Sequence, residues 1–237
     1  MLEIAGCTKK QNLVWITAGS LKLPATLEIP KNAQGVVLFI HGSGSVRDNY
    51  RNQLVAQVLR QAQLATLLID LLTAEEEAID LRTQHHLRFD IGLLAARVVS
   101  LTDWLHQNTT TRDLKVGYFG ASTGSAAAML AATERPGVVS AIVSRGGRPD
   151  LAGSALSRVK APTLLIVGEN HIPVREMNQE AFLHLHTPKR LGIIPGATHL
   201  FEEPGALEEV AKLASRWFSR YLTPTHQGLH QPKTSLS

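Results

Sequence analysis

The stretch "VGYFGASTGSAAAML", residues 116–130, decides the fold. It has the pattern of a buried strand, a turn with the sequence GASTG at residues 120–124, and a helix of small residues. G-x-S-x-G is weak evidence by itself, because glycine and serine are both common. Between a strand and a helix, however, it is typical of a nucleophile elbow, in which glycines relieve the crowding of a strained serine turn. We predict that Ser122 is a nucleophile; an ordinary tight packing turn is the alternative.

Short apolar runs alternate with helical patterns on both sides of this turn. Continuous apolar runs are typical of parallel strands that are covered on both faces. The alternation therefore predicts an α/β fold, an open and mainly parallel sheet with helices on both sides, in which ligands bind at the carboxyl ends of the strands. Strands are expected at residues 13–17, 25–29, 35–40, 65–70, 115–121, 139–144, 163–168 and 190–196, with amphipathic helices at 87–106 and 205–222.

The chain of 237 residues, 44% of them apolar, suits a single globular domain, which we place at residues 1–222. Residues 223–237 are polar and interrupted by proline, and we expect them to form a disordered tail. The single cysteine, Cys7, excludes an internal disulfide and fits a reducing compartment, so a cytoplasmic location is predicted.

The charge pattern argues against large charged partners. Lys and Arg number 24 against 20 Asp and Glu, no long basic run occurs, and 5% of the residues are aromatic, so nucleic-acid binding is not expected. The longest apolar runs have the length of strands, so no membrane segment is expected either. A small-molecule substrate is the predicted partner.

A serine hydroxyl is a weak nucleophile until a base takes its proton. The best candidate base is His199, in the predicted loop between the last strand and the last helix. A histidine that caps or packs against the helix is the alternative. The remaining candidates are less well placed, in helical segments or in the tail: His85, His86, His106, His184, His186, His226 and His230.

A glycine-rich turn, "HGSGS" at residues 41–45, follows an early strand. Such a turn can direct a backbone N–H, from Ser43 or Gly44, at an oxyanion that develops during acyl transfer, and the N–H of Thr123 would supply the second donor. A plain turn is the alternative. The turn does not match G-x-G-x-x-G, because position 47 is Arg, and no cofactor is predicted.

Taken together, the chain resembles the α/β-hydrolase superfamily, and specifically its dienelactone-hydrolase-like branch. The resemblance covers residues 20–222, and its pattern is similar to a small bacterial hydrolase module that also occurs fused to phosphoribosyltransferases. It implies a cofactor-free hydrolase of esters or lactones, although the namesake of the branch uses a cysteine where this chain has Ser122. It rests on "HGSGS", "GYFGASTG", "SRGGRPDLAG", "APTLLIVG" and "PGATHLFEEPGALEEVA".

The resemblance also implies an aspartate in a G-x-x-D-x-x-V arrangement after the strand "TLLIVG". Gly168 and Val174 match this arrangement, but the acid position is His171. Glu169, two residues earlier, and Asp150, after the preceding strand, are the two candidate replacements, and the absence of any acid is the third possibility. Each candidate also has a structural alternative, Glu169 as an exposed loop charge and Asp150 as a helix cap.

Arg47, Arg51 and Arg145 follow predicted strand ends, as Arg148 also does, where a substrate would enter. Guanidinium groups suit carboxylates and phosphates, so an anionic ester or lactone is a candidate substrate, with ordinary surface charge as the alternative. The acidic cluster Glu75–Glu77 matches no zinc spacing, and no metal is predicted. The competing functions are a catalytically impaired protein that binds a ligand or partner, and acyl transfer.

Overall fold

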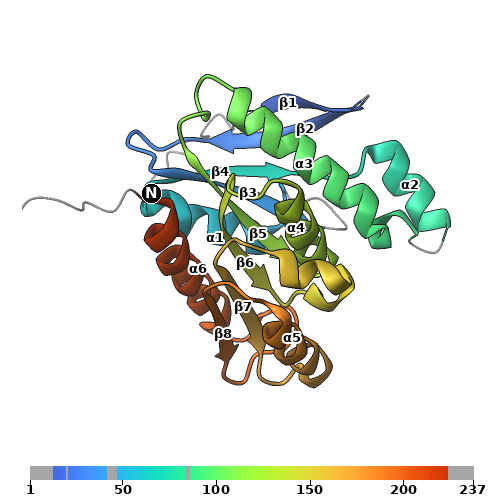
Figure 1. The fold of residues 1–237 in the computed structure, drawn as a ribbon, viewed down its shortest axis with the longest axis vertical. Coiled ribbons are helices and arrows are strands. Elements are labelled where there is room, and N and C mark those ends of the chain that lie inside the picture. Colours follow the sequence, from blue (N-terminus) through green and yellow to red (C-terminus); the bar gives the residue numbers. More distant parts are fainter. Residues whose placement is uncertain (1–12, 20, 42–46, 84–85, 224–237) are drawn as a thin grey trace, which may run out of the picture.

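In the computed structural model, residues 13–19, 21–41, 47–83 and 86–223 are described. Their strands form one eight-stranded sheet in the order β1-β2-β4-β3-β5-β6-β7-β8, with helices on both faces (Figure 1). The pairs β1–β2 and β2–β4 are antiparallel, and the remaining neighbours are parallel. The predicted α/β class and mainly parallel sheet are therefore confirmed. The predicted tail at 223–237 lies, except for Thr223, outside the described residues.

The strands are β1 (Leu13–Ala18), β2 (Leu21–Glu28), β3 (Gly35–His41), β4 (Leu64–Ile69), β5 (Lys115–Ala121), β6 (Val139–Arg145), β7 (Thr163–Gly168) and β8 (Lys189–Ile194). The α-helices are α1 (Tyr50–Gln61), α2 (Ala74–Arg82), α3 (Ile91–Gln107), α4 (Thr123–Glu134), α5 (Ile172–His184) and α6 (Ala206–Leu222). Two 3₁₀ helices are η1 (Leu87–Phe89) and η2 (Pro149–Arg158).

Successive side chains of the central strands enter two separate cores. Along β3, Val36, Leu38 and Ile40 face the core shared with α3, α4 and α5, whereas Val37 and Phe39 face the core shared with α1 and α6. Because side chains alternate across a strand, a strand covered on both faces must be apolar at every position. This is why "GVVLFI" has no alternating polar pattern.

Helix α6 lies directly on the central strands at two glycines. A Cβ at Gly117 of β5 would lie 2.8 Å from Cε1 of Phe218, and a Cβ at Gly35 of β3 would lie 2.7 Å from Cβ of Leu222. Contacts this short are not tolerated in packed interiors. The missing side chains at the two glycines therefore allow the last helix to cover the strands that lead into the site.

Two predicted elements differ from the structure. The helix expected at 87–106 is divided, because Asp90 ends η1 and caps α3, where its side chain accepts a hydrogen bond from the N–H of Leu93 at 2.9 Å. The strand expected at 25–29 begins at Leu21 and contains Pro24, which the sequence analysis treats as a break. At Pro24 the strand pairs with β1 and not yet with β4, so one side of it is open and tolerates a residue without an N–H.

The acidic segment before α3 has structural partners. Glu76 forms a capping box with Thr73 and an ion pair with Arg97, at 2.7 Å from Nη1 of the guanidinium. The buried carboxylate of Asp80 accepts from the N–H of Leu87 at 2.7 Å and pairs with Arg88. Within the described part of the chain, no group of three or more potential ligand side chains is arranged to hold a metal ion, and no helix is long and apolar enough to cross a membrane.

The approach of α4 to the end of β3 generates the first prediction. A Cβ at Gly124 would lie 2.3 Å from the carbonyl oxygen of Ile40, which is backbone and cannot rotate away. Gly124→Ala should therefore lower the free energy of unfolding by about 1–3 kcal/mol, as overpacking does. Urea unfolding followed by circular dichroism measures this change.

Gly92→Ala is the matched control, because a Cβ there would lie 3.5 Å from Oδ1 of Asp90, an ordinary contact. This variant should be neutral or more stable by up to about 1 kcal/mol. An unfolding midpoint for Gly124→Ala equal to that of Gly92→Ala would contradict the close approach.

Candidate active site

Ser122 lies at a sharp bend between β5 and α4. Its φ of 51° and ψ of −128° are unusual for a residue with a side chain. It is the N-cap of α4, the residue immediately before the first helical residue. Its carbonyl oxygen accepts hydrogen bonds from the N–H groups of Ser125 at 3.1 Å and Arg148 at 3.0 Å. The strand-turn-helix context that the sequence predicts for this serine is present, and its backbone is strained in the way that a nucleophile elbow requires.

The two glycines of the motif allow this bend. A Cβ at Gly120 would lie 2.7 Å from Cα of Ser125, so the end of strand β5 lies directly against the first turn of helix α4. A Cβ at Gly124 would collide with the end of β3, as described above. A larger residue at either position would require the neighbouring backbone to shift.

The N–H of Thr123 is the first of helix α4, and the first N–H groups of a helix have no acceptor within the helix. It can therefore donate to an oxyanion beside Ser122. The other expected donors, Ser43 and Gly44, lie outside the described residues. The strand that leads to them ends at His41, which pairs with Ala121 immediately before the serine. The assignment of the oxyanion donors stays a prediction.

His199 lies in the connection between β8 and α6, as expected. A Cβ at Gly146, just after β6, would be 3.4 Å from Nδ1 of His199, so this loop glycine and the imidazole are in contact. The same loop donates the Arg148 N–H to the Ser122 carbonyl. One loop therefore touches both proposed catalytic residues.

The loop from Gly146 to Arg148 is fixed on two sides at Gly147. The sequence analysis did not predict these contacts. A Cβ at Gly147 would lie 2.1 Å from the hydroxyls of Ser125 and Ser144, which hydrogen-bond to each other at 2.9 Å. The buried side chain of Asn178, on α5, donates to the carbonyl of Gly147 at 2.9 Å. The glycine pair in "SRGGR" was the available signal, because two adjacent glycines after a buried strand indicate a close approach of backbone.

His171, at the position where the resemblance implies an aspartate, lies against His199. The two ring centroids are 4.7 Å apart, with an angle of 64° between the ring planes. In the described structure, Nδ1 of each ring is buried and has no hydrogen-bond partner. The contact expected of a triad acid is therefore made by an imidazole, and the nitrogen that a carboxylate would engage is unpaired.

Neither candidate acid is bonded to His199. Oε2 of Glu169 accepts from the N–H of Gly196 at 2.8 Å, which fixes the turn after β8. Asp150 pairs with the guanidinium of Arg148, with a shortest distance of 2.7 Å. The role of either carboxylate as triad acid stays a prediction without a supporting contact.

The surroundings of His199 lower its pKa below the ordinary value. Burial is the main cause, followed by electrostatic interactions with His171, Arg145 and Arg51. Each of these disfavours the imidazolium form. At neutral pH His199 is consequently the neutral imidazole, the form that can accept a proton from a serine.

The four arginines at the strand ends have different partners. Arg47 pairs with Asp70 at 3.0 Å, and Arg148 pairs with Asp150. Nη1 of Arg51 pairs with the exposed Glu202 at 2.8 Å, while its Nε is buried without a partner. The paired arginines have carboxylates of this chain to balance their charge.

Arg145, the last residue of β6, differs from the other three. Its residue exposure is 7%, no ion pair or hydrogen bond to it is found in the described structure, and its Nη1 is buried and unpartnered. The guanidinium carbon lies 6.0 Å from the centre of the Phe119 ring. Burial, and then the charge of Arg51, lowers the pKa of Arg145 to about 10, so the group remains charged at neutral pH.

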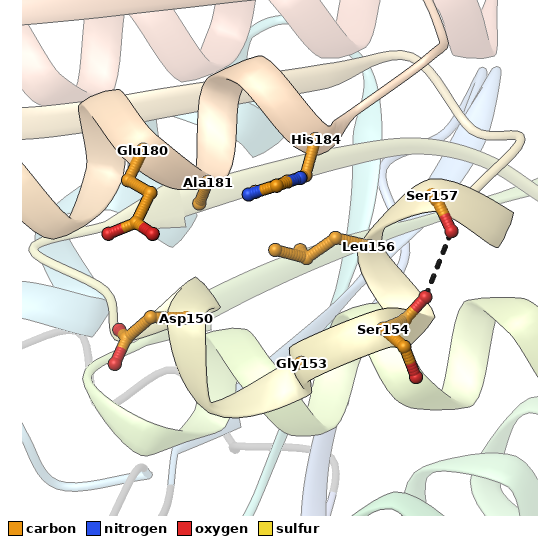
Figure 2. Close-up of a pocket in the computed structure, with 8 residues that line it drawn as sticks. All are labelled: Asp150, Gly153, Ser154, Leu156, Ser157, Glu180, Ala181 and His184. Carbon is orange, nitrogen blue, oxygen red and sulfur yellow. Dashed lines mark hydrogen bonds between the residues drawn. The ribbon is translucent and has the colours of Figure 1, made fainter.

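A separate cavity of about 510 Å³ lies between η2 and α5 (Figure 2). Of the candidate site residues, Asp150 alone contributes to its lining, and Ser122 and His199 do not. Figure 2 shows the carboxylates of Asp150 and Glu180 at one end and His184 toward the other. The cavity does not contain the proposed chemistry, so the site is assigned from Ser122 and His199 rather than from cavity size.

The chain is similar to known proteins over most of its length. Two Mycobacterium tuberculosis proteins named "Putative phosphoribosyl transferase", from strains H37Rv and CDC 1551, are each 52% identical to the chain over 209 residues. The match covers 88% of the chain, which spans about half the length (46%) of these curated relatives.

Solved structures are similar over most of the chain. A dienelactone hydrolase from Anabaena variabilis is 64% identical, with a TM-score of 0.87 over 90% of this chain and 98% of that one. Est1E from Butyrivibrio proteoclasticus, 16% identical with a TM-score of 0.72 over 88% of this chain and 98% of that one, shares the fold. A sequence model of the dienelactone hydrolase family matches residues 23–224. The chain therefore belongs to the dienelactone hydrolase family and has the α/β-hydrolase fold.

Proposed function

We propose that this chain is a serine hydrolase of small carboxylic esters or lactones, with Ser122 as nucleophile and His199 as base. The observation that carries the proposal is the strained backbone of Ser122 at the strand-to-helix bend. Membership of a hydrolase family supports hydrolysis over the alternative of a binding protein without activity.

The reaction would proceed in two steps. Oγ of Ser122 attacks the carbonyl carbon while His199 takes the hydroxyl proton, and the N–H of Thr123 stabilises the resulting oxyanion. Collapse expels the alcohol, which receives the proton from His199 and leaves an acyl-serine. A water molecule, activated by His199 in the same way, then releases the acid and restores the serine.

The missing triad acid limits the expected rate. Altering this acid in a serine protease reduces kcat by about 10⁴, or roughly 5.5 kcal/mol of barrier. Total enzymatic accelerations correspond to about 8–23 kcal/mol, so the reaction remains feasible but slow. The proposal that the substrate is anionic depends on the arginines at the strand ends. The unpaired Arg145 supports it more strongly than the paired Arg47.

The nucleophile is tested by Ser122→Ala. Hydrolysis of p-nitrophenyl butyrate should fall by about 10²-fold, because losing a whole triad costs about 2 × 10⁶ and the missing acid already accounts for about 10⁴ of it. Ser100→Ala, a serine on α3 whose hydroxyl donates to the Ala96 carbonyl, is the control and should retain wild-type activity. Labelling by a fluorophosphonate should follow the same pattern, and equal turnover by wild type and Ser122→Ala would exclude this nucleophile.

The two candidate acids are tested by Glu169→Gln and Asp150→Asn. Because their carboxylates bond to Gly196 and Arg148, each variant should keep kcat within about tenfold of wild type, far less than the roughly 10⁴ effect of a triad acid. A loss of about 10³-fold or more in one variant would assign the acid to that residue.

The pH profile tests the protonation state of His199. Its lowered pKa disfavours the imidazolium, so the neutral base persists to more acidic pH than for an unperturbed histidine. In a zwitterionic buffer, the acidic limb of kcat/KM should have its midpoint below about 6.5, the ordinary pKa of histidine. A midpoint above that value would mean that burial and the neighbouring cations do not control this base.

A further inference from the structure

Around His199 the structure gathers buried nitrogen atoms that have no partner. In the described part of the chain these are Nη1 of Arg145, Nε of Arg51, and Nδ1 of both His171 and His199. They come from the end of β6, from α1, and from the loops beside β7 and β8. Buried polar groups are almost always hydrogen-bonded, so a cluster of unpaired ones indicates an acceptor that the protein itself does not provide.

Arg145 is the strongest indication that this acceptor is an anion. A buried charge is normally paired, because burial without a counter-charge is costly. The described residues contribute no ion pair or hydrogen bond to this guanidinium, and the pKa of about 10 leaves it charged at neutral pH. The positive charges of Arg145 and Arg51 both act on His199.

None of the neighbouring carboxylates pairs with Arg145 in the described structure. Glu202 is exposed and pairs with Nη1 of Arg51. The remaining two accept from backbone N–H groups: Glu169 from Gly196 at 2.8 Å, and Oε1 of Glu203 from Thr198 at 2.9 Å, while Oε2 of Glu203 is buried without a partner among the described residues. The charge of Arg145 is therefore open to an anion supplied from outside the described residues.

We propose that the place of the missing triad acid is a binding site for a small carboxylate anion, held by Arg145 and His171 beside His199. The guanidinium fork matches the two oxygens of a carboxylate. Nδ1–H of His199 would donate to the same anion, which gives the imidazole the tautomer whose Nε2 can accept the serine proton. The site extends the known hydrolase pattern, since the family's acid is a residue of the chain.

The catalytic part of this inference rests on the proposed function. When the proton of Ser122 moves to Nε2, His199 becomes an imidazolium, and a bound anion would stabilise that charge as a triad aspartate does. No bond to the anion forms or breaks, and it leaves unchanged. The anion is either free in solution or the carboxylate group of the substrate itself.

Binding is tested separately from activity, in the inactive Ser122→Ala protein. Formate or acetate should raise its Tm with increasing concentration, because a ligand that binds the folded state alone stabilises it. Adding Arg145→Met should abolish this rise, whereas Arg112→Gln, an exposed arginine that pairs with Asp113, should retain it. A Tm that does not respond to either anion, or that responds equally after Arg145→Met, would overturn the site.

Activity is tested with the active enzyme and a neutral ester. Added acetate should raise kcat/KM by at least about tenfold, part of the roughly 10⁴ that a triad acid contributes. His171→Asp should be faster than wild type without added anion and should no longer respond to acetate. Acetate dependence that persists unchanged in His171→Asp would overturn the role of the anion as a substitute acid.

Two further outcomes separate the possibilities. A carboxylated ester that reaches the accelerated rate without added acetate would identify the substrate's own carboxylate as the occupant. An acetate-dependent Tm in a protein that hydrolyses no ester would support the anion site while removing the proposed hydrolysis.

Discussion

The bend at Ser122 is the constraint on which the rest of the site depends. A residue with a side chain at a φ of 51° is held there because β5 and α4 are packed too closely for any other path. Glycine is needed at 120 because a Cβ there would meet Cα of Ser125 on α4 at 2.7 Å, and at 124 because a Cβ there would meet the Ile40 carbonyl oxygen of β3 at 2.3 Å. The same bend leaves the N–H of the first helical residue without an acceptor in the helix and places the serine carbonyl where Arg148 can donate to it.

That hydrogen bond connects the bend to the second half of the site. The loop from Gly146 to Arg148 contacts the imidazole of His199 at one end and the serine backbone at the other. Asn178 of α5 donates to the Gly147 carbonyl of this loop, and the paired hydroxyls of Ser144 and Ser125 lie close to Gly147. Because central strands covered on both faces form a rigid scaffold, side chains at their carboxyl ends keep a defined spacing.

The electrostatic surroundings of His199 are opposite to those of an ordinary triad. An aspartate would favour the imidazolium, whereas His171, Arg145 and Arg51 disfavour it. The base is consequently kept neutral and ready to accept a proton, but the charge that forms on it lacks an internal partner among the described residues. An external carboxylate would reconcile the strained nucleophile bend with the absent acid.

Sequence patterns predict strands well where burial is complete, and less well elsewhere. Residues 115–121 and 163–168 are strands with the predicted limits. A short, continuous apolar run that contains or adjoins glycine or proline is typical of a buried strand. The helix pattern at 87–106 missed the interruption at Asp90, since local capping there overrides a continuous apolar stripe. Pro24 wrongly indicated a break in the strand. Whether a strand accepts a residue without an N–H depends on which side of the strand is unpaired, a property of the assembled sheet.

The sequence by itself determined the fold class, the position of the elbow serine and the replacement of the expected aspartate by His171, because each depends on residue type at a fixed local spacing. Tertiary structure alone decided which charges are paired. Arg47, Arg51, Arg145 and Arg148 look equivalent in the sequence, yet three have carboxylate partners and Arg145 is buried without one in the described structure. Pairing depends on distances between side chains that are far apart along the chain, and burial depends on the whole packed arrangement around them.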